Sequence, residues 1–133
     1  MKTLFICQAN VGRSQAAMEI HRQLGGEADS AGTKVDAPGA TLAERPSAAT
    51  IIGIMKHDFG VDMTPNVRTQ LTEELASNYD KLVVMAEEET WPEWLKTDPR
   101  LVHWKIQDPK FQDPSTTQRI VDEVAANVRS YTQ

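Results

Sequence analysis

The sequence has one cysteine, Cys7, among its 133 residues, and this excludes an internal disulfide and any metal site built from several cysteines. Its longest apolar runs, such as residues 82–86, are far shorter than a membrane span. Residues 1–3 lead directly into a predicted strand and do not resemble a signal peptide. Lys and Arg are fewer than Asp and Glu, and the resulting net charge of −5 disfavours a nucleic-acid partner. We therefore expect a cytoplasmic protein that binds neither nucleic acid nor a membrane.

The length of the chain suits one domain, residues 1–133, without repeats or low-complexity segments. Strand and helix patterns alternate along it, which predicts an α/β fold with a mostly parallel sheet. The expected strands are residues 2–6, 27–33, 81–86 and 101–104. The expected helices are residues 13–24, 46–59 and 72–75, followed by a last helix that begins near residue 115.

Glycine, proline and threonine mark the ends of these helices. Gly25 and Gly26 stop the first, and Pro46 suits the first turn of the second. Gly60 ends the second, and Thr72 is expected to cap the third. The residues expected on buried helix faces are Ala16, Ala17, Ile20, Leu24, Ala48, Ile51, Ile52, Met55, Phe59, Ile120, Val121, Val124, Ala125 and Val128.

Cys7 lies where the first strand ends, and a five-residue loop separates it from Arg13 at the start of a helix. Backbone N–H groups converge in such a loop, and the helix dipole favours negative charge, so a tetrahedral oxyanion fits there. A thiol in this position is expected to ionise to a thiolate nucleophile. The alternative is that Cys7 is a buried small hydrophobic residue, the commoner fate of a lone cysteine.

The residues that follow Cys7 fit an oxyanion loop. Arg13 can hold two phosphate oxygens with its planar fork. Ser14 can donate its hydroxyl to the thiolate, Asn10 can adopt positive φ, and Gly12 adds backbone freedom. In parallel sheets, ligands bind beyond the carboxyl ends of the strands, where Cys7 lies. The sequence has no Walker loop and no GxGxxG motif after a strand, which excludes the common nucleotide sites.

Attack of a thiolate on phosphorus forms a phosphocysteine, and the leaving oxygen then needs a proton from an acid. Three Asp-Pro pairs provide candidates. Asp98 is best explained as a turn residue before the last strand, and Asp113 as the cap of the last helix. Asp108 follows the last strand on the expected ligand side and has no capping role. It is the preferred acid, with Asp113 as the alternative.

The chain resembles the low-molecular-weight protein tyrosine phosphatases, which share a scaffold with thioredoxin-coupled arsenate reductases. The resemblance covers nearly the whole chain. It is carried by CQANVGRS at 7–14, DSAGT at 29–33, residues 60–72 with GVD and QLT at their ends, VVM at 83–85 and WKIQDP at 104–109. It implies a three-layer α/β sandwich with a four-stranded parallel sheet.

The resemblance also implies roles for individual residues. Cys7 is the nucleophile, Arg13 binds phosphate, and Asp108 is first the acid and then the base. Ser14 assists the thiolate, and Asn10 and Ser30 support the loop. Asn66 stands where many relatives have a histidine that supports the loop. The residues implied to bind the substrate phosphate are Gln8, Ala9, Asn10, Val11, Gly12, Arg13 and Ser14. The implied partner is a phosphoprotein or small aryl phosphate, with no cofactor and no metal.

Departures from the family pattern bear on the reaction. Gly12 replaces a second cysteine found in many members, so a protective disulfide cannot form, and Val11 is typical of the phosphatases. Lys110 and Phe111 follow Asp-Pro, where tyrosine phosphatases place aromatic residues. The expected function is a cysteine-dependent phosphatase acting on phosphotyrosine-type esters. The alternatives are an arsenate reductase that uses an external thiol and a catalytically weak oxyanion-binding module.

Other conspicuous residues have structural interpretations. His21, His57 and His103 lack the spacing of metal ligands. Trp91 and Trp94 are expected to cover the core. The acidic run of residues 87–89 is expected to form a solvated face or a helix start.

Overall fold

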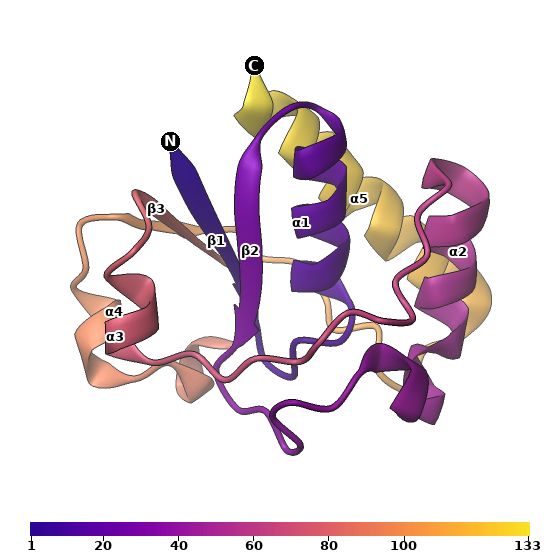
Figure 1. The fold of residues 1–133 in the computed structure, drawn as a ribbon, viewed down its shortest axis with the longest axis horizontal. Coiled ribbons are helices and arrows are strands. Elements are labelled where there is room, and N and C mark those ends of the chain that lie inside the picture. Colours follow the sequence, from indigo (N-terminus) through magenta and orange to yellow (C-terminus); the bar gives the residue numbers. More distant parts are fainter.

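The first strand, β1, lies at the centre of a four-stranded sheet in the computed structural model, which describes residues 1–133 (Figure 1). The strands are β1 (Lys2–Cys7), β2 (Glu27–Gly32), β3 (Lys81–Val84) and β4 (Leu101–His103), in the order β2-β1-β3-β4. All pairings are parallel, with Cys7 opposite Gly32 and Ile6 opposite Val84. The carboxyl ends of the strands therefore meet at one edge of the sheet, as the sequence predicts.

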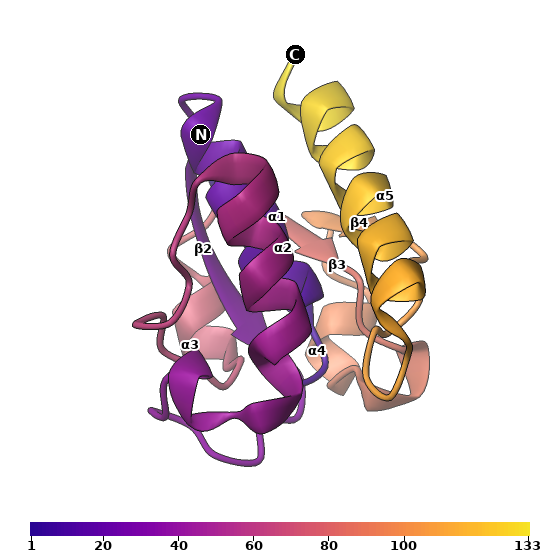
Figure 2. The ribbon, with the colours of Figure 1, turned by 90° about the vertical axis from the view of Figure 1, so that its right-hand side faces the viewer.

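Helices cover both faces of this sheet and give the expected three layers. On one face lie α1 (Arg13–Gln23), α2 (Ala49–Phe59) and α5 (Pro114–Thr132), and Figure 2 looks onto this layer. The short α3 (Glu73–Ala76) and α4 (Glu93–Lys96) lie on the other.

Alternate residues of β1 supply the two halves of the core. Phe5 and Cys7 point toward α1 and α5, whereas Leu4 and Ile6 pack with the residues around α3 and α4. A strand buried on both faces must be apolar throughout. The run Leu4-Phe5-Ile6 meets this requirement and therefore occupies the centre of the sheet.

Most predicted element boundaries agree with the structure to within two residues. β3 ends at Val84 rather than at residue 86, and Gly60 ends α2 with φ 69°. Thr72 accepts a hydrogen bond from the backbone N–H of Leu75, as expected of a cap. Pro46 begins a short 3₁₀ turn, η2 (Pro46–Ala48), which leads directly into α2.

The expected burial of Leu24 is wrong, because its side chain is 49% exposed. α1 ends at Gln23, and Leu24 is the capping residue where the chain reverses. Gly25, with φ 92°, turns the chain toward β2 before another apolar position can face the core.

The last helix, α5, buries Ile120, Val121, Val124, Ala125 and Val128, the face that the sequence predicts. No helix in this protein combines the length and the apolar character needed to cross a membrane. Trp91 and Trp94 pack against the core on the opposite face of the sheet, as expected.

The end of α5 makes two part-buried polar contacts, one to β1 and one to α1. The Tyr131 hydroxyl lies 2.6 Å from the hydroxyl of Thr3, a fully buried residue of β1. Next to it, His21 Nδ1 lies 2.8 Å from the Thr132 hydroxyl. These contacts fix the last helix against the central strand and α1.

We predict that Tyr131→Phe lowers the free energy of unfolding by about 1–3 kcal/mol, because it leaves the buried Thr3 hydroxyl without a partner. The double variant Thr3→Val/Tyr131→Phe is expected to be more stable than Tyr131→Phe alone, since both polar partners are then gone. Urea unfolding followed by circular dichroism measures both. A Tyr131→Phe protein as stable as the wild type would contradict this role.

Candidate functional site

The loop of residues 8–12, between β1 and α1, takes its shape from Asn10. This residue has φ 55°, the left-handed conformation expected from the sequence, and its side chain is buried. Asn10 Nδ2 donates to Ser14 Oγ at 2.8 Å and to Ser30 Oγ at 3.0 Å. Asn10 Oδ1 accepts from the backbone N–H of Thr69 at 2.8 Å. One side chain thus connects the loop to α1, to β2 and to the segment before α3.

The carbonyl groups of the loop are satisfied by the surrounding protein, whereas its amides are not. The carbonyls of Gln8, Ala9 and Asn10 each accept a hydrogen bond from a group outside the loop. Their donors are the backbone N–H of Lys34, the guanidinium of Arg68 and the side-chain amide of Gln15. The amides of residues 8–12 donate to no acceptor in the protein. Such a set of free amides is suited to bind an oxyanion.

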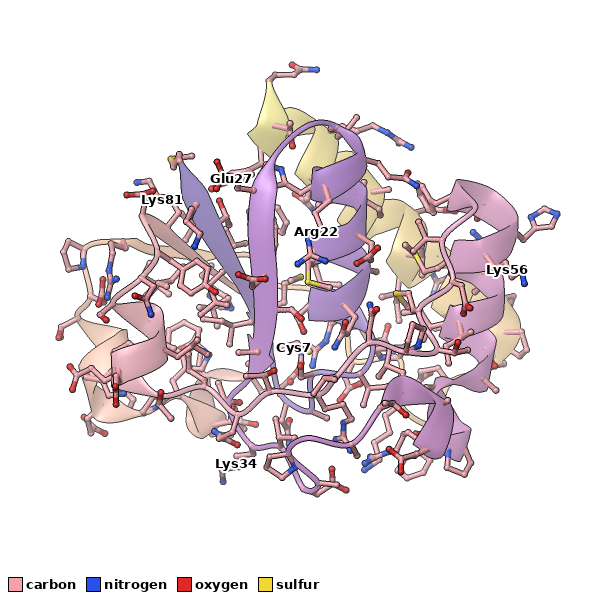
Figure 3. The ribbon with its side chains drawn as sticks, in the orientation of Figure 1. Cys7, Arg22, Glu27, Lys34, Lys56 and Lys81 are labelled. Carbon is pink, nitrogen blue, oxygen red and sulfur yellow. The ribbon has the colours of Figure 1, made fainter.

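Cys7 lies at the bottom of a pocket of about 300 Å³ at the carboxyl edge of the sheet. Figure 3 shows it at the end of β1, under the amino end of α1. Cys7 is buried and belongs to the core cluster around α1, yet its Sγ lies 3.0 Å from Ser14 Oγ. Cys7 is therefore buried, as its interpretation as a small hydrophobic residue predicts, but it also has a polar partner and lines the pocket.

Arg13 is only 2% exposed, and its guanidinium is surrounded by acceptors. It donates to the carbonyls of Met85 at 2.6 Å and Ile106 at 2.9 Å, and to both carboxylate oxygens of Glu87. Burial alone would lower the pKa of Arg13, but the charge of the facing Cys7, the hydrogen bonds that Arg13 donates to Glu87 and the charge of Asp108 together raise it. Arg13 therefore stays positively charged in the pocket wall.

Of the three Asp-Pro pairs, only Asp108 reaches this pocket. Asp108 Oδ2 lies 3.7 Å from Arg13 Nη2, and the other oxygen accepts from the backbone N–H of Lys110. Asp113 instead caps α5 by accepting from the N–H of Thr116 at 2.7 Å, which lowers its pKa. Asp98 accepts from the backbone N–H of Arg100 in a turn. The turn and cap expected for Asp98 and Asp113 are confirmed.

Gly12 contributes space, not unusual backbone conformation. Its φ is −108°, which any residue can adopt, so the expected need for backbone freedom is wrong. A Cβ at Gly12 would lie 3.1 Å from Pro109 Cγ and 3.2 Å from Ile51 Cδ1. The small residue lets the segment that carries Asp108 approach the loop, and a cysteine here would require both neighbours to shift.

The expected supporting residues Ser30 and Asn66 both reach the loop network. Ser30 accepts directly from Asn10, whereas Asn66 acts through Gln15, to which it donates at 3.1 Å. Gln15 in turn donates to Asn10. Sequence reasoning missed Gln15, and no local pattern distinguishes a buried glutamine from an exposed one at this helical position.

A second network connects the loop to the pocket rim. Arg68, 2% exposed, donates to the Ala9 carbonyl and pairs with Asp36, which also pairs with Arg45 at the rim. The hydrogen bond from Arg68 and the second pair with Arg45 lower the pKa of Asp36 to about 2. Asp36 lies in the segment after β2, to which the sequence analysis assigns no role.

Lys110 and Phe111 form the opposite rim. Phe111 is 90% exposed and has φ 63°, and the Lys110 ammonium lies 5.0 Å from the centre of its ring. Both residues therefore stand at the pocket mouth, and neither is part of the core. No group of three or more His, Cys, Asp or Glu side chains is arranged to hold a metal ion.

We predict that Asp36→Asn destabilises the protein near neutral pH but not in strong acid. A carboxylate whose pKa falls to about 2 on folding adds stability above its unfolded pKa of about 4, and this is lost as the pH falls toward 2. Urea unfolding at pH 6 and pH 2.5 measures the effect, with Asp122→Asn, at a carboxylate that pairs with no cation, as the control. A difference from wild type that is the same at both pH values would contradict this.

Comparison with known proteins places this site in context. The family model for low molecular weight phosphotyrosine protein phosphatase matches residues 2–133. No curated protein sequence matches the chain.

Three solved structures share the fold. The low molecular weight protein tyrosine phosphatase from T. tengcongensis is 20% identical with a TM-score of 0.79, and the alignment covers 98% of this chain and 97% of that one. Wzb from Vibrio vulnificus, in complex with benzylphosphonate, is 22% identical with a TM-score of 0.81 and coverage of 98% and 96%. The YwlE arginine phosphatase from Geobacillus stearothermophilus is 19% identical with a TM-score of 0.79 and coverage of 98% and 90%. Since the family model extends over nearly the whole chain, this protein belongs to the low molecular weight phosphotyrosine protein phosphatase family.

Proposed function

We propose that this protein is a cysteine-dependent phosphatase that hydrolyses phosphotyrosine-type aryl phosphate monoesters. The observation that carries the proposal is the meeting of Cys7, Arg13 and Asp108 in one pocket beneath a loop of free amides. A nucleophile, a fixed cation and a carboxylate are the groups that transfer of a phosphoryl group to sulfur requires.

In the first step, the Cys7 thiolate attacks phosphorus and the bond to the aryl oxygen breaks. Protonated Asp108 gives its proton to the leaving phenolate, which departs as a phenol. In the second step, water attacks phosphorus and transfers a proton to the Asp108 carboxylate. The P–S bond breaks, phosphate leaves, and the thiolate is restored. Arg13 and the loop amides stabilise the negative charge on the transferred group in both steps.

The hydrogen bonds around Ser14 support its role toward the thiolate. Asn10 Nδ2 donates to Ser14 Oγ, which therefore uses a lone pair as acceptor. The hydroxyl proton of Ser14 remains free to point at Cys7 Sγ, 3.0 Å away. In this way the side chain that shapes the loop also directs a donor toward the nucleophile.

Charge in the pocket favours phosphotyrosine over phosphoarginine, although both kinds of phosphatase share this fold. Asp108 is the only carboxylate in the pocket lining, whereas Arg13, Arg45 and Lys110 are cationic. The cationic guanidino group of phosphoarginine would lie near the cationic Lys110 at the rim, where the pocket has no second carboxylate to pair with it. A phenolic group carries no such charge, and the exposed ring of Phe111 offers it an apolar contact.

The test compares matched peptides that carry phosphotyrosine or phosphoarginine, without added thiol beyond a reductant that keeps Cys7 reduced. We expect kcat/KM at least about tenfold higher for phosphotyrosine. Cys7→Ser is expected to abolish turnover but still bind phosphate, whereas Arg13→Ala loses both. Faster release from phosphoarginine would overturn the substrate assignment. Arsenate reduction that depends on an external thiol, without phosphate release, would identify a reductase.

Asp108→Ala is predicted to lower kcat for aryl phosphates by about 10²–10⁴-fold, the usual contribution of an acid. The loss should be smaller for an ester whose phenol is a strong acid, because that leaving group needs less protonation. Asp113→Ala should retain activity and instead lower the free energy of unfolding, since Asp113 caps α5. The reverse pattern in steady-state kinetics and urea unfolding would exchange the two roles.

A further inference from the structure

Glu87 holds the guanidinium of Arg13 by its Nη1–Nη2 end. Arg13 Nη2 donates to Glu87 Oε1 at 3.0 Å, and Nη1 donates to Oε2 at 3.1 Å. This is a two-point pairing of a planar fork with a planar carboxylate, which fixes both distance and orientation. The sequence predicts a solvated face or a helix start for residues 87–89, and Glu87 does precede a 3₁₀ turn, Glu88–Thr90. Its side chain is 34% exposed, against 71% for Glu88, because it also pairs with Arg13.

The partners of Arg13 divide its N–H groups into two sets. Nη1 serves Met85, Ile106 and Glu87, and one N–H of Nη2 serves Glu87. Nε donates to no acceptor, and since no side-chain polar atom of the protein is both buried and unpartnered, Nε is open to the pocket. The free donors are therefore Nε–H and the second N–H of Nη2, which together form one side of the fork.

This division shows that Glu87 and an oxyanion do not need the same donors. Glu87 takes the Nη1–Nη2 end of the guanidinium, and the Nε–Nη2 side remains for two oxygens of a tetrahedral anion. A carboxylate that competed with phosphate would instead occupy the side that faces the pocket.

The backbone around Glu87 is itself held in place. Glu87 lies three residues beyond the end of β3, and its carbonyl accepts from the Thr90 amide at 2.9 Å and from the Thr90 hydroxyl at 2.7 Å. The same hydroxyl lies 2.8 Å from that of Thr33, just beyond β2. The backbone of Glu87 is thus connected to the segments that follow β3 and β2. Its carboxylate is therefore a rigid support for the long, flexible side chain of Arg13.

We propose that Glu87 is a positioning residue, which aims the Nε–Nη2 side of Arg13 at the phosphate. The inference rests on the phosphate-binding role proposed above for Arg13. Without Glu87, the guanidinium keeps its two carbonyl partners on Nη1 but loses the second point that fixes its rotation. Phosphate would then bind less tightly, and the transition state would lose more than the ground state.

The decisive experiment is a double-mutant cycle between Glu87→Gln and Arg13→Lys, with Glu89→Gln as the matched control. In the wild-type background, Glu87→Gln is expected to lower kcat/KM by about 10- to 100-fold and to weaken inhibition by inorganic phosphate. In the Arg13→Lys background it should change kcat/KM by less than about threefold, because an ammonium has no fork to orient. Glu89→Gln should match the wild type, and thermal unfolding confirms that each variant is folded.

Three outcomes would overturn the proposal. An equal loss from Glu87→Gln in both backgrounds would mean a general structural effect, an unchanged kcat/KM would mean no role, and tighter phosphate inhibition would mean that Glu87 competes with the anion.

Protection of Cys7 by inorganic phosphate against alkylation by iodoacetamide separates this inference from the proposed function. Should the wild type hydrolyse no phosphate ester, weaker protection in Glu87→Gln would still support the positioning role. Absence of protection in the wild type would overturn both.

Discussion

The whole site depends on the backbone of residues 8–12 keeping its carbonyls bonded to the protein and its amides free. This is an unusual condition, because a buried loop normally satisfies both. It is met here because Lys34, Gln15 and Arg68 supply donors to three successive carbonyls, and Asn10 holds the turn with a left-handed backbone and four side-chain hydrogen bonds. The amides then have only an anion or water left to bind.

A buried cation is the second constraint. Arg13 loses its hydration at 2% exposure, and the surrounding carbonyls and carboxylates replace that hydration. These acceptors come from two neighbouring segments at the sheet edge: Met85 and Glu87 follow β3, while Ile106 and Asp108 follow β4. The parallel order of the strands is therefore what allows one guanidinium to be enclosed on one side and open on the other.

Much of the fold follows from local patterns in the sequence. The alternation of strands and helices, the apolar β1, the caps Thr72 and Asp113, and the positive φ of Asn10 all agree with the structure, since each depends on a few neighbouring residues. Leu24 was misjudged because helical spacing does not reveal where the chain reverses. The role of Glu87 was missed although this residue directly follows the expected strand of residues 81–86, at the edge where Cys7 was expected to act.

The sequence by itself determined most of the elements, the loop between Cys7 and Arg13, and the family to which the chain belongs. The tertiary structure decided which side chains meet across long distances: Asp108 rather than Asp113 at the pocket, Glu87 on Arg13, Arg68 on Ala9, and Pro109 over Gly12. The reason is physical. Capping, turn and strand preferences act between residues a few positions apart, whereas the pairing of charges and the clearance between loops depend on the register of strands joined by long connections.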